Sequence, residues 1–325
     1  MRGLYPKESL QALCDLFGKS RQAWYQSETH GVGQEELNGK LLAFVKNERK
    51  DQPRIGTKKL QFMINKAFAD QGIFIGRDRL AHLLRSQGLL IRRRRKYHPV
   101  MTNGNGQSIY PDLRKGLIVN EINQLWCCDI TYVKLNTSDR FGYGTFVTDE
   151  KSHLIVGYHF SLEMTAAQTL IALDLAVEKE LGEQEGFNHS LIFHTDRGSQ
   201  FKSALFRAFH DQYQIRMSMA EQGKSSENPV SERLNGILKN ELMIQNSFDS
   251  FDQAKRAIDR AVNIYNERRP HLSCNFLTPK EAHKPGLGLL KKLWKQRKKK
   301  SKLNLKAKSK SHNPQAVEKK ITGNE

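Results

Sequence analysis

The chain has 325 residues, 38% of them hydrophobic, which is enough for two or three domains with at least one sizeable core and excludes a fibrous or wholly disordered protein. Its 53 Lys and Arg against 34 Asp and Glu give a net charge of +19, which indicates a polyanionic partner, nucleic acid before a membrane surface. The sequence has no signal-peptide core and no apolar run of about 20 residues, so we expect a cytoplasmic protein without a membrane span.

The N-terminal region is predicted to be helical, because its hydrophobic residues recur at intervals of three and four and glycines separate the segments. Two of these segments, 57–70 and 77–87, are compatible with a helix-turn-helix, and a plain helical hairpin fits the periodicity equally well. In a helix-turn-helix, Arg77 and Arg79 near the start of the second helix would face DNA.

Basic runs follow this region and end the chain. Arg92, Arg93, Arg94 and Arg95 precede a Gly- and Asn-rich segment that is typical of a linker. Residues 284–325 hold 14 Lys and Arg against two Glu, a composition that favours a flexible tail that binds phosphates without sequence preference. The predicted organisation is a helical, helix-turn-helix-like DNA-binding region at 1–97, a linker at 98–119, a second domain at 120–285 and a Lys-rich tail at 286–325.

The second domain alternates strand-like and helix-like segments. Three successive strands followed by alternating helices and strands predict an α/β fold, a mixed sheet with helices packed against it. The expected strands are 124–135, 141–149, 154–162, 190–194 and 215–219, and the expected helices are 165–181, 200–213, 229–243 and 251–267.

Three carboxylates in this domain are candidates for a site. Asp129 lies in the middle of an apolar strand, where a buried carboxylate is costly unless a cation neutralises it or the strand is open to solvent. Asp196 directly follows an apolar strand, at the sheet edge where α/β proteins place their sites. Glu232 falls in the first turn of a helix that Asn228 caps and Pro229 starts. Each alone has an ordinary structural explanation, so only the combination indicates a site.

The combination points to metal-dependent phosphoryl chemistry. Glu232, Asn235 and Lys239 share the helix face opposite the hydrophobic stripe, since seven residues make nearly two turns. Three carboxylates suit Mg²⁺ or Mn²⁺, and two such ions can clamp the attacking and leaving oxygens of a phosphoryl transfer. In so basic a protein, the predicted substrate is a nucleic acid backbone.

The surrounding residues resemble a known family. Asp196 and Glu232 have 35 residues between them, and the chain resembles the DD(35)E transposases and retroviral integrases, most of all the orfB-type proteins of the insertion-sequence-three family. The similarity runs from about residue 5 to 285. The segments that carry it are 126–132, 194–200, 227–239, 265–271 and 277–282, and upstream 53–60 and 76–95, which look like the family's helix-turn-helix.

This resemblance implies that residues 120–285 are an RNase-H-like integrase core that cleaves and transfers DNA strands with two divalent ions, Mg²⁺ or Mn²⁺. It implies Asp129, Asp196 and Glu232 as catalytic metal ligands. Two positions depart from the family pattern without touching this triad: His153 stands where many relatives have Arg, and Pro229 where Ala is frequent. The DNA contacts expected are Lys239, Asn235, Arg77, Arg79, Arg92, Arg93, Arg94, Arg95, Arg269 and His271.

The resemblance also implies partners: DNA of the element's ends and of the target, further copies of the chain, and an upstream orfA-type protein or its frameshift fusion. A non-catalytic or domesticated DNA-binding relative that acts as a regulator is the alternative. An RNase H is disfavoured by the spacing and by the segment at 265–271. Four cysteines without a CxxC pair favour free thiols over disulfides or structural zinc, with Cys127 and Cys128 as core residues.

Overall fold

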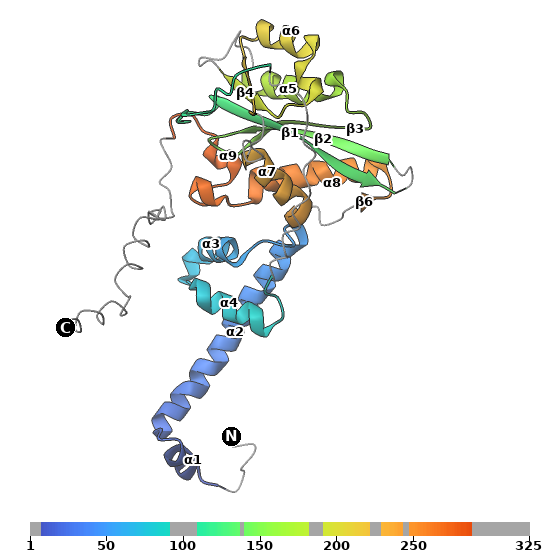
Figure 1. Ribbon diagram of the computed structural model, residues 1–325. Helices are drawn as coiled ribbons and strands as arrows, with labels where there is room; N and C mark the ends of the chain where they lie inside the picture. Colours follow the sequence, from blue (N-terminus) through green and yellow to red (C-terminus); the bar gives the residue numbers. More distant parts are fainter. Residues whose placement is uncertain are drawn as a thin grey trace, which may run out of the picture. The chain divides into compact units, whose positions relative to one another are not determined.

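The computed structural model in Figure 1 describes residues 8–91, 109–136, 140–181, 191–221, 229–242 and 247–287. The predictions for Arg92–Arg95, for the cap at Asn228 and for the Lys-rich tail lie outside these residues. Within them, no helix is both long and apolar enough to cross a membrane.

The N-terminal region is helical, as predicted. Its elements are α1 (Leu10–Leu16), α2 (Arg21–Asp51), α3 (Thr57–Ala67), the 3₁₀ turn η1 (Ala69–Gln71) and α4 (Arg77–Ser86). Gly72, which ends η1, has a φ of 67°, a left-handed conformation that glycine adopts without strain. The side chains that α2, α3 and α4 bury together are Leu41, Val45, Ile55, Leu60, Ile64, Ile75, Leu80 and Leu84.

A mixed sheet forms the centre of the second domain (Figure 1). In the described residues its order is β3-β2-β1-β4-β5, and a short β6 adds to β1. β2 runs antiparallel to both β1 and β3, whereas β4, β5 and β6 run parallel to their neighbours. The strands are β1 (Leu125–Leu135), β2 (Arg140–Asp149), β3 (Ile155–Ser161), β4 (Ile192–Thr195), β5 (Arg216–Met219) and β6 (Ser247–Phe248).

Helices cover both faces of the sheet, and each face has its own hydrophobic core. On one face lie α5 (Ala166–Leu181), η2 (Ser199–Lys202) and α6 (Ala204–Gln212). On the other lie α7 (Pro229–Ile237), the π-helical turn η3 (Leu238–Leu242) and α8 (Phe251–Asn263), followed by η4 (Ile264–Arg268), η5 (Leu272–Cys274) and α9 (Pro279–Ala282). This arrangement is the predicted RNase-H-like fold.

Alternation along β1 decides which face receives the predicted catalytic aspartate. Trp126 and Cys128 pack into the core under α5 and α6, and Val133 and Leu135 pack into the core under α7 and α8. Because successive side chains of a strand point to opposite faces, Asp129 shares the parity of Val133 and faces α7. Burial of Cys127 and Cys128 confirms their predicted role in the core, and Trp126 beside them is buried as well.

The structure differs from the sequence prediction at a few element ends. The helix expected at 200–213 is divided into the 3₁₀ turn η2 and α6, and α6 is capped by Ser203, whose hydroxyl accepts from the Phe206 N–H at 3.3 Å. The strand β6 was not predicted, because two residues are too few to show a periodicity. Gly157 allows β3 and α5 to approach closely: a Cβ there would lie 2.2 Å from the Ala172 carbonyl oxygen.

Candidate active site

Strand pairing brings Asp129 and Asp196 to neighbouring positions. In the parallel ladder between β1 and β4, Cys127 pairs with His194. Asp129 and Asp196 each lie two residues further along, on the same face of their strands and at the end of β4. This is the carboxyl edge that the sequence predicted for Asp196.

Both aspartates accept hydrogen bonds from neutral donors. Asp129 Oδ1 accepts from the N–H of Ile130 at 2.9 Å, and Oδ2 accepts from Asn235 Nδ2 at 2.7 Å. Asp196 Oδ1 accepts from the N–H of Gly198 at 3.0 Å in the turn after β4. These bonds orient the carboxylates without cancelling their charge.

The third carboxylate and the adjacent lysine come from the helix that faces Asp129. Leu234 and Ile237 are buried against the sheet, which turns Glu232 to the solvent and Asn235 toward Asp129. Lys239 follows in η3 and is half-buried; burial lowers its pKa, and the charge of Asp129 raises it. Asn235 of the predicted shared face therefore meets β1, whereas Glu232 of the same face is exposed.

Electrostatics tie these groups together. Burial, followed by the charges of Asp196 and Glu232, raises the pKa of Asp129 to about 7, although hydrogen bonds from Ile130 and Asn235 lower it. The pKa of Asp196 is also raised, chiefly by burial, although the Gly198 N–H and the charges of nearby basic side chains lower it. Asp129 is only half-buried and Glu232 is exposed, so a cation from the solvent can reach these carboxylates and relieve their mutual repulsion. The three carboxylates are not close enough to form a complete ligand set. Among the described residues, the only three His, Cys, Asp or Glu side chains with ligand atoms within 4.8 Å of one another lie elsewhere in the domain.

A second set of buried ionic groups was missed by the sequence reasoning. Asp149, at the end of β2, accepts from the N–H groups of Asn123 and Ser152 at 2.9 and 2.8 Å and from the Ser152 hydroxyl at 2.7 Å. His283 bonds through Nδ1 to that hydroxyl and through Nε2 to Glu180, each at 2.8 Å. No motif signals this network, because its members are spread over 160 residues of the sequence, from 123 to 283.

Comparisons with known proteins identify the family of the domain that carries these residues. Two profiles of the integrase core domain match residues 119–225 and 213–279. A 31 kDa protein of insertion element IS600 from Shigella sonnei is 30% identical over 272 residues, which cover 82% of this chain and 96% of that protein. The transposase InsF of insertion sequence IS3A from Escherichia coli K12 is 27% identical over 283 residues, 84% of this chain and 93% of InsF. The chain belongs to the IS3 family of insertion-sequence transposases.

The resemblance found in the sequence is thereby confirmed, and so is the integrase-core fold of this transposase. Among solved structures, the catalytic core domain of HTLV-2 integrase in complex with magnesium is similar with a TM-score of 0.39 and 23% identity. That match covers 50% of the transposase and 98% of the integrase chain.

The residues predicted to contact DNA fall into different environments in the transposase. Arg77 and Arg79 are exposed at the start of α4, as a DNA-reading helix requires. Arg269 is only 1% exposed and is paired with Glu241, and His271 is 9% exposed. These two side chains are part of the domain's interior, so the described conformation presents neither of them to a phosphate.

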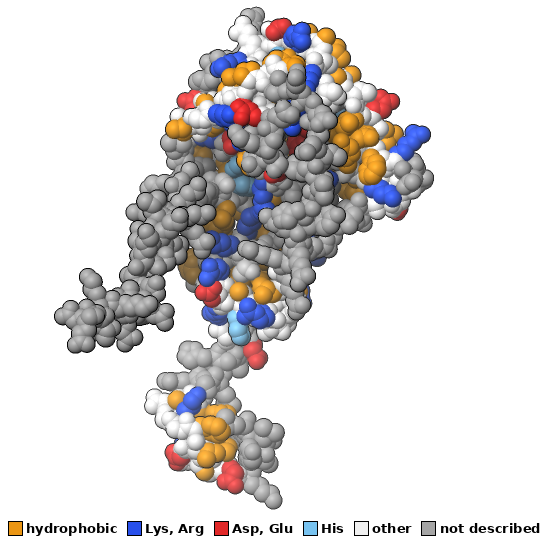
Figure 2. All heavy atoms as spheres, viewed as in Figure 1, with side chains coloured by type: hydrophobic (Ala, Val, Ile, Leu, Met, Phe, Trp, Pro, Cys, Tyr) orange, Lys and Arg blue, Asp and Glu red, His pale blue; other side chains and the backbone are white. Residues whose placement is uncertain are grey.

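Figure 2 shows where charge lies on one face of the transposase. Lys and Arg side chains are spread over this face among fewer acidic ones. The net charge of +19 is therefore not confined to the tail, and the described surface contributes to it. Such a surface can contact a polyanion at many points.

Proposed function

We propose that this transposase cleaves and joins DNA strands with the triad Asp129, Asp196 and Glu232. The observation that carries the proposal is the convergence of carboxylates from β1, the loop after β4 and α7: besides burial, the charges of Asp196 and Glu232 help to raise the pKa of Asp129 to about 7. Carboxylates kept together at this energetic cost are typical of sites that hold cations.

The residues fit divalent ions of the Mg²⁺ or Mn²⁺ type. All three side chains offer oxygen ligands, and the donors that reach Asp129 are a backbone N–H and an amide, which leave its charge uncompensated. We infer two ions, held by Asp129, Asp196 and Glu232. When bound, they would activate the attacking oxygen and stabilise the leaving oxygen of a phosphodiester.

The chain's own residues position the DNA. The charge of Asp129 acts on Lys239, so we propose that the ammonium group of this lysine binds a phosphate next to the reacting one. Asn235 holds Asp129 through its amide and acts by positioning that carboxylate. Arg77 and Arg79 remain proposed contacts of the helical region, whereas Arg269 and His271 leave the proposed set because both are buried.

A strand-transfer assay tests the proposal. The full chain is incubated with labelled DNA carrying the ends of its element and with Mg²⁺ or Mn²⁺. We expect nicking or joining by the native protein and none by Asp196→Asn or Glu232→Gln, with DNA binding retained. Asp174→Asn and Glu178→Gln, which change exposed carboxylates of α5 on the other face of the sheet, should leave the reaction unchanged.

The alternative function, a DNA-binding regulator without catalysis, predicts binding and no reaction with either ion. Because the family resemblance implies an upstream protein, the assay is repeated with the upstream reading frame supplied as a separate or fused chain. A reaction that appears only then, and still requires Glu232, supports the triad and identifies the partner. Activity that survives Asp196→Asn and Glu232→Gln would contradict the proposed mechanism.

A further inference from the structure

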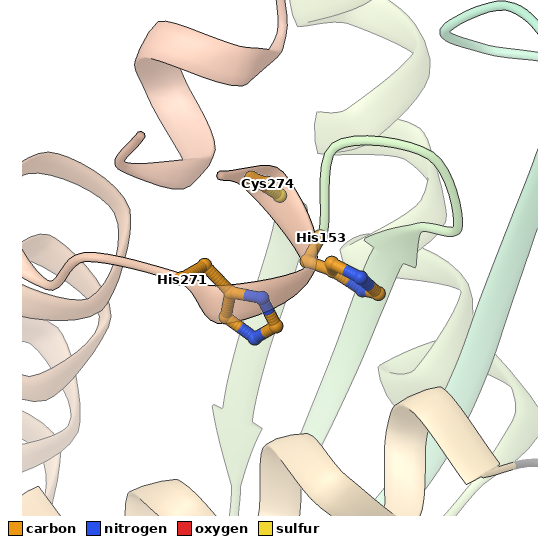
Figure 3. A group of neighbouring side chains, drawn as sticks. All are labelled: His153, His271 and Cys274. Carbon is orange, nitrogen blue, oxygen red and sulfur yellow. The ribbon is translucent and has the colours of Figure 1, made fainter. Parts of the chain in front are cut away.

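Three side chains outside the triad bring nitrogen and sulfur atoms together. His153 lies in the turn between β2 and β3, and His271 and Cys274 belong to the segment between η4 and α9. One ligand atom of each lies within 4.8 Å of the other two, and in the described part of the chain no other three His, Cys, Asp or Glu side chains do so. Figure 3 shows the two imidazole rings side by side, with Cys274 next to them.

The backbone holds these side chains in place. His153 has a φ of 60°, a left-handed conformation that is unfavourable for a residue other than glycine, and its N–H donates to the Asp149 carbonyl at 2.8 Å. The thiol of Cys274 donates to the carbonyl of Ser152 at 3.3 Å, which ties the second segment to the same turn. The ring centroids of His153 and His271 are 4.4 Å apart.

One ring nitrogen in this cluster lacks a partner. His271 is 9% exposed, and its Nδ1 is buried without a hydrogen bond, which is costly for a polar atom. His210 is a useful contrast, since both of its ring nitrogens are also buried without partners. The rings around His210, however, are those of Phe193, Phe206 and Phe209, so nothing there completes a ligand set.

We propose that His153, His271 and Cys274 bind one transition-metal ion of the zinc class. Two imidazoles and a thiolate are the ligands that Zn²⁺ prefers, whereas Mg²⁺ prefers oxygen. Cys274 loses its proton to solvent on binding, and a fourth position stays open to water or another ligand. His271 and Cys274 have the spacing His-x-x-Cys, and His153 is 118 residues before His271. Without a CxxC pair, the sequence argued against structural zinc.

Such an ion would fasten two segments that support the catalytic helix. It would join the β2–β3 turn to the segment that carries Arg269, which pairs with Glu241 in η3. Lys239 lies in the same π-helical turn, directly after α7. The ion would therefore act as a structural clip, and its binding can be measured without a catalytic assay.

Cobalt substitution tests the proposal. The full chain is stripped of metal with a chelator and titrated with Co²⁺, whose thiolate complexes have charge-transfer absorption. The titration uses an Asp196→Asn background, so that the carboxylate triad does not compete. We expect one Co²⁺ per chain with a thiolate band and displacement by Zn²⁺. Zn²⁺ at a hundredfold excess over its Kd should raise Tm by roughly 5–10 °C.

Matched variants locate the ion. Cys274→Ala and His271→Ala should lose the thiolate band, whereas Cys127→Ala, which removes another buried thiol with a 3.3 Å hydrogen bond, should keep it. His153→Asn should weaken Co²⁺ binding at least tenfold while keeping a residue that tolerates positive φ. Absence of the thiolate band in the parent protein, or its survival in Cys274→Ala, would overturn the proposal whether or not the other variants fold.

Discussion

Two buried aspartates on neighbouring strands of the same sheet have opposite electrostatics. Asp129 in β1 has a pKa raised to about 7 by burial and by the charges of Asp196 and Glu232. Asp149 at the end of β2 is even more deeply buried, yet its pKa is lowered, because hydrogen bonds and the charge of His283 outweigh the burial. Burial alone therefore does not set the state of a carboxylate in this domain; its neighbours do.

This difference distinguishes the candidate site around Asp129 from the network around Asp149, which stabilises the fold. The Asp149 carboxylate accepts hydrogen bonds from Asn123 and Ser152 and pairs with His283, so the fold itself satisfies its charge. Asp129 instead faces two further carboxylates, which destabilise its charged form and leave it to be satisfied by something that binds. A protein commonly gives up stability in this way at a functional site.

Replacing Asp129 should produce the largest change in activity. For Asp129→Asn we expect strand cleavage to fall at least about a hundredfold, since a ligand and a charge are lost where charge develops. The free energy of unfolding should rise by roughly 1–3 kcal/mol near neutral pH, because a carboxyl group with a raised pKa destabilises the folded protein when it is ionised. Strand-transfer assays and urea unfolding of the same preparation measure both. Retained activity of Asp129→Asn, or a lower free energy of unfolding than that of the native protein, would contradict this contrast between Asp129 and Asp149.

Replacing Asp149 should do the opposite. Asp149→Ala leaves two backbone N–H groups without their acceptor and His283 without one of its charges, so we expect a loss of about 3–5 kcal/mol of unfolding free energy. Any loss of activity should be proportional to the unfolded fraction. Urea unfolding measures the loss, with Asp174→Ala on exposed α5 as the control within about 0.5 kcal/mol of the native protein. An Asp149→Ala protein as stable as the native one would mean that this network does not stabilise the fold.

The same network predicts how stability depends on pH. Burial lowers the pKa of His283, but hydrogen bonds and the charges of Glu180 and Asp149 raise it to about 9, above the ordinary value of 6.5. A raised histidine pKa stabilises the fold fully below 6.5, and this contribution is lost as the pH rises through about 9. Between these values we expect a decrease of up to about 3 kcal/mol.

Chemical unfolding of the native protein and of His283→Gln between about pH 6 and about pH 9.5 measures this contribution as the difference between the two curves. The lowered pKa values of Asp149 and Glu180 act only at more acidic pH, so they do not overlap this window. Parallel curves for the two proteins would show that His283 is not charged in the fold.

Local sequence predicted the sheet and placed the three candidate carboxylates in their elements, because both depend on short segments. The strand that carries Asp129 is a continuous run of β-favouring residues, and Asp196 follows its strand directly, so parallel pairing alone brings them together. The helix from 229 was visible from its hydrophobic stripe, and Leu234 and Ile237 are buried as that stripe predicts. The family resemblance supplied the roles of these residues.

Sequence could not reveal partners that lie far apart along the chain. Arg269 and His271, in the segment 265–271 that resembles the family, were predicted as DNA contacts, but Arg269 is buried and pairs with Glu241. Asp149 and His283 are 134 residues apart, and each alone is indistinguishable from a surface charge. The switch of the catalytic helix to a π-helical turn at Leu238 also has no signal in the hydrophobic pattern.

The smallest predicted effect concerns the basic neighbour of Asp129. The charge of Asp129 raises the pKa of Lys239, but in the described structure the hydrogen bonds to Asp129 come from Ile130 and Asn235. The ammonium group of Lys239 can therefore bind a phosphate. For Lys239→Gln we expect DNA affinity to fall a few-fold and the dependence of log K on log salt to become shallower by about 1, the value for one phosphate contact. Lys255→Gln changes an exposed lysine of α8 and should leave the slope unchanged. Salt titrations of binding to one end fragment compare the three proteins. Equal slopes for the native protein and Lys239→Gln would show that Lys239 contacts no phosphate.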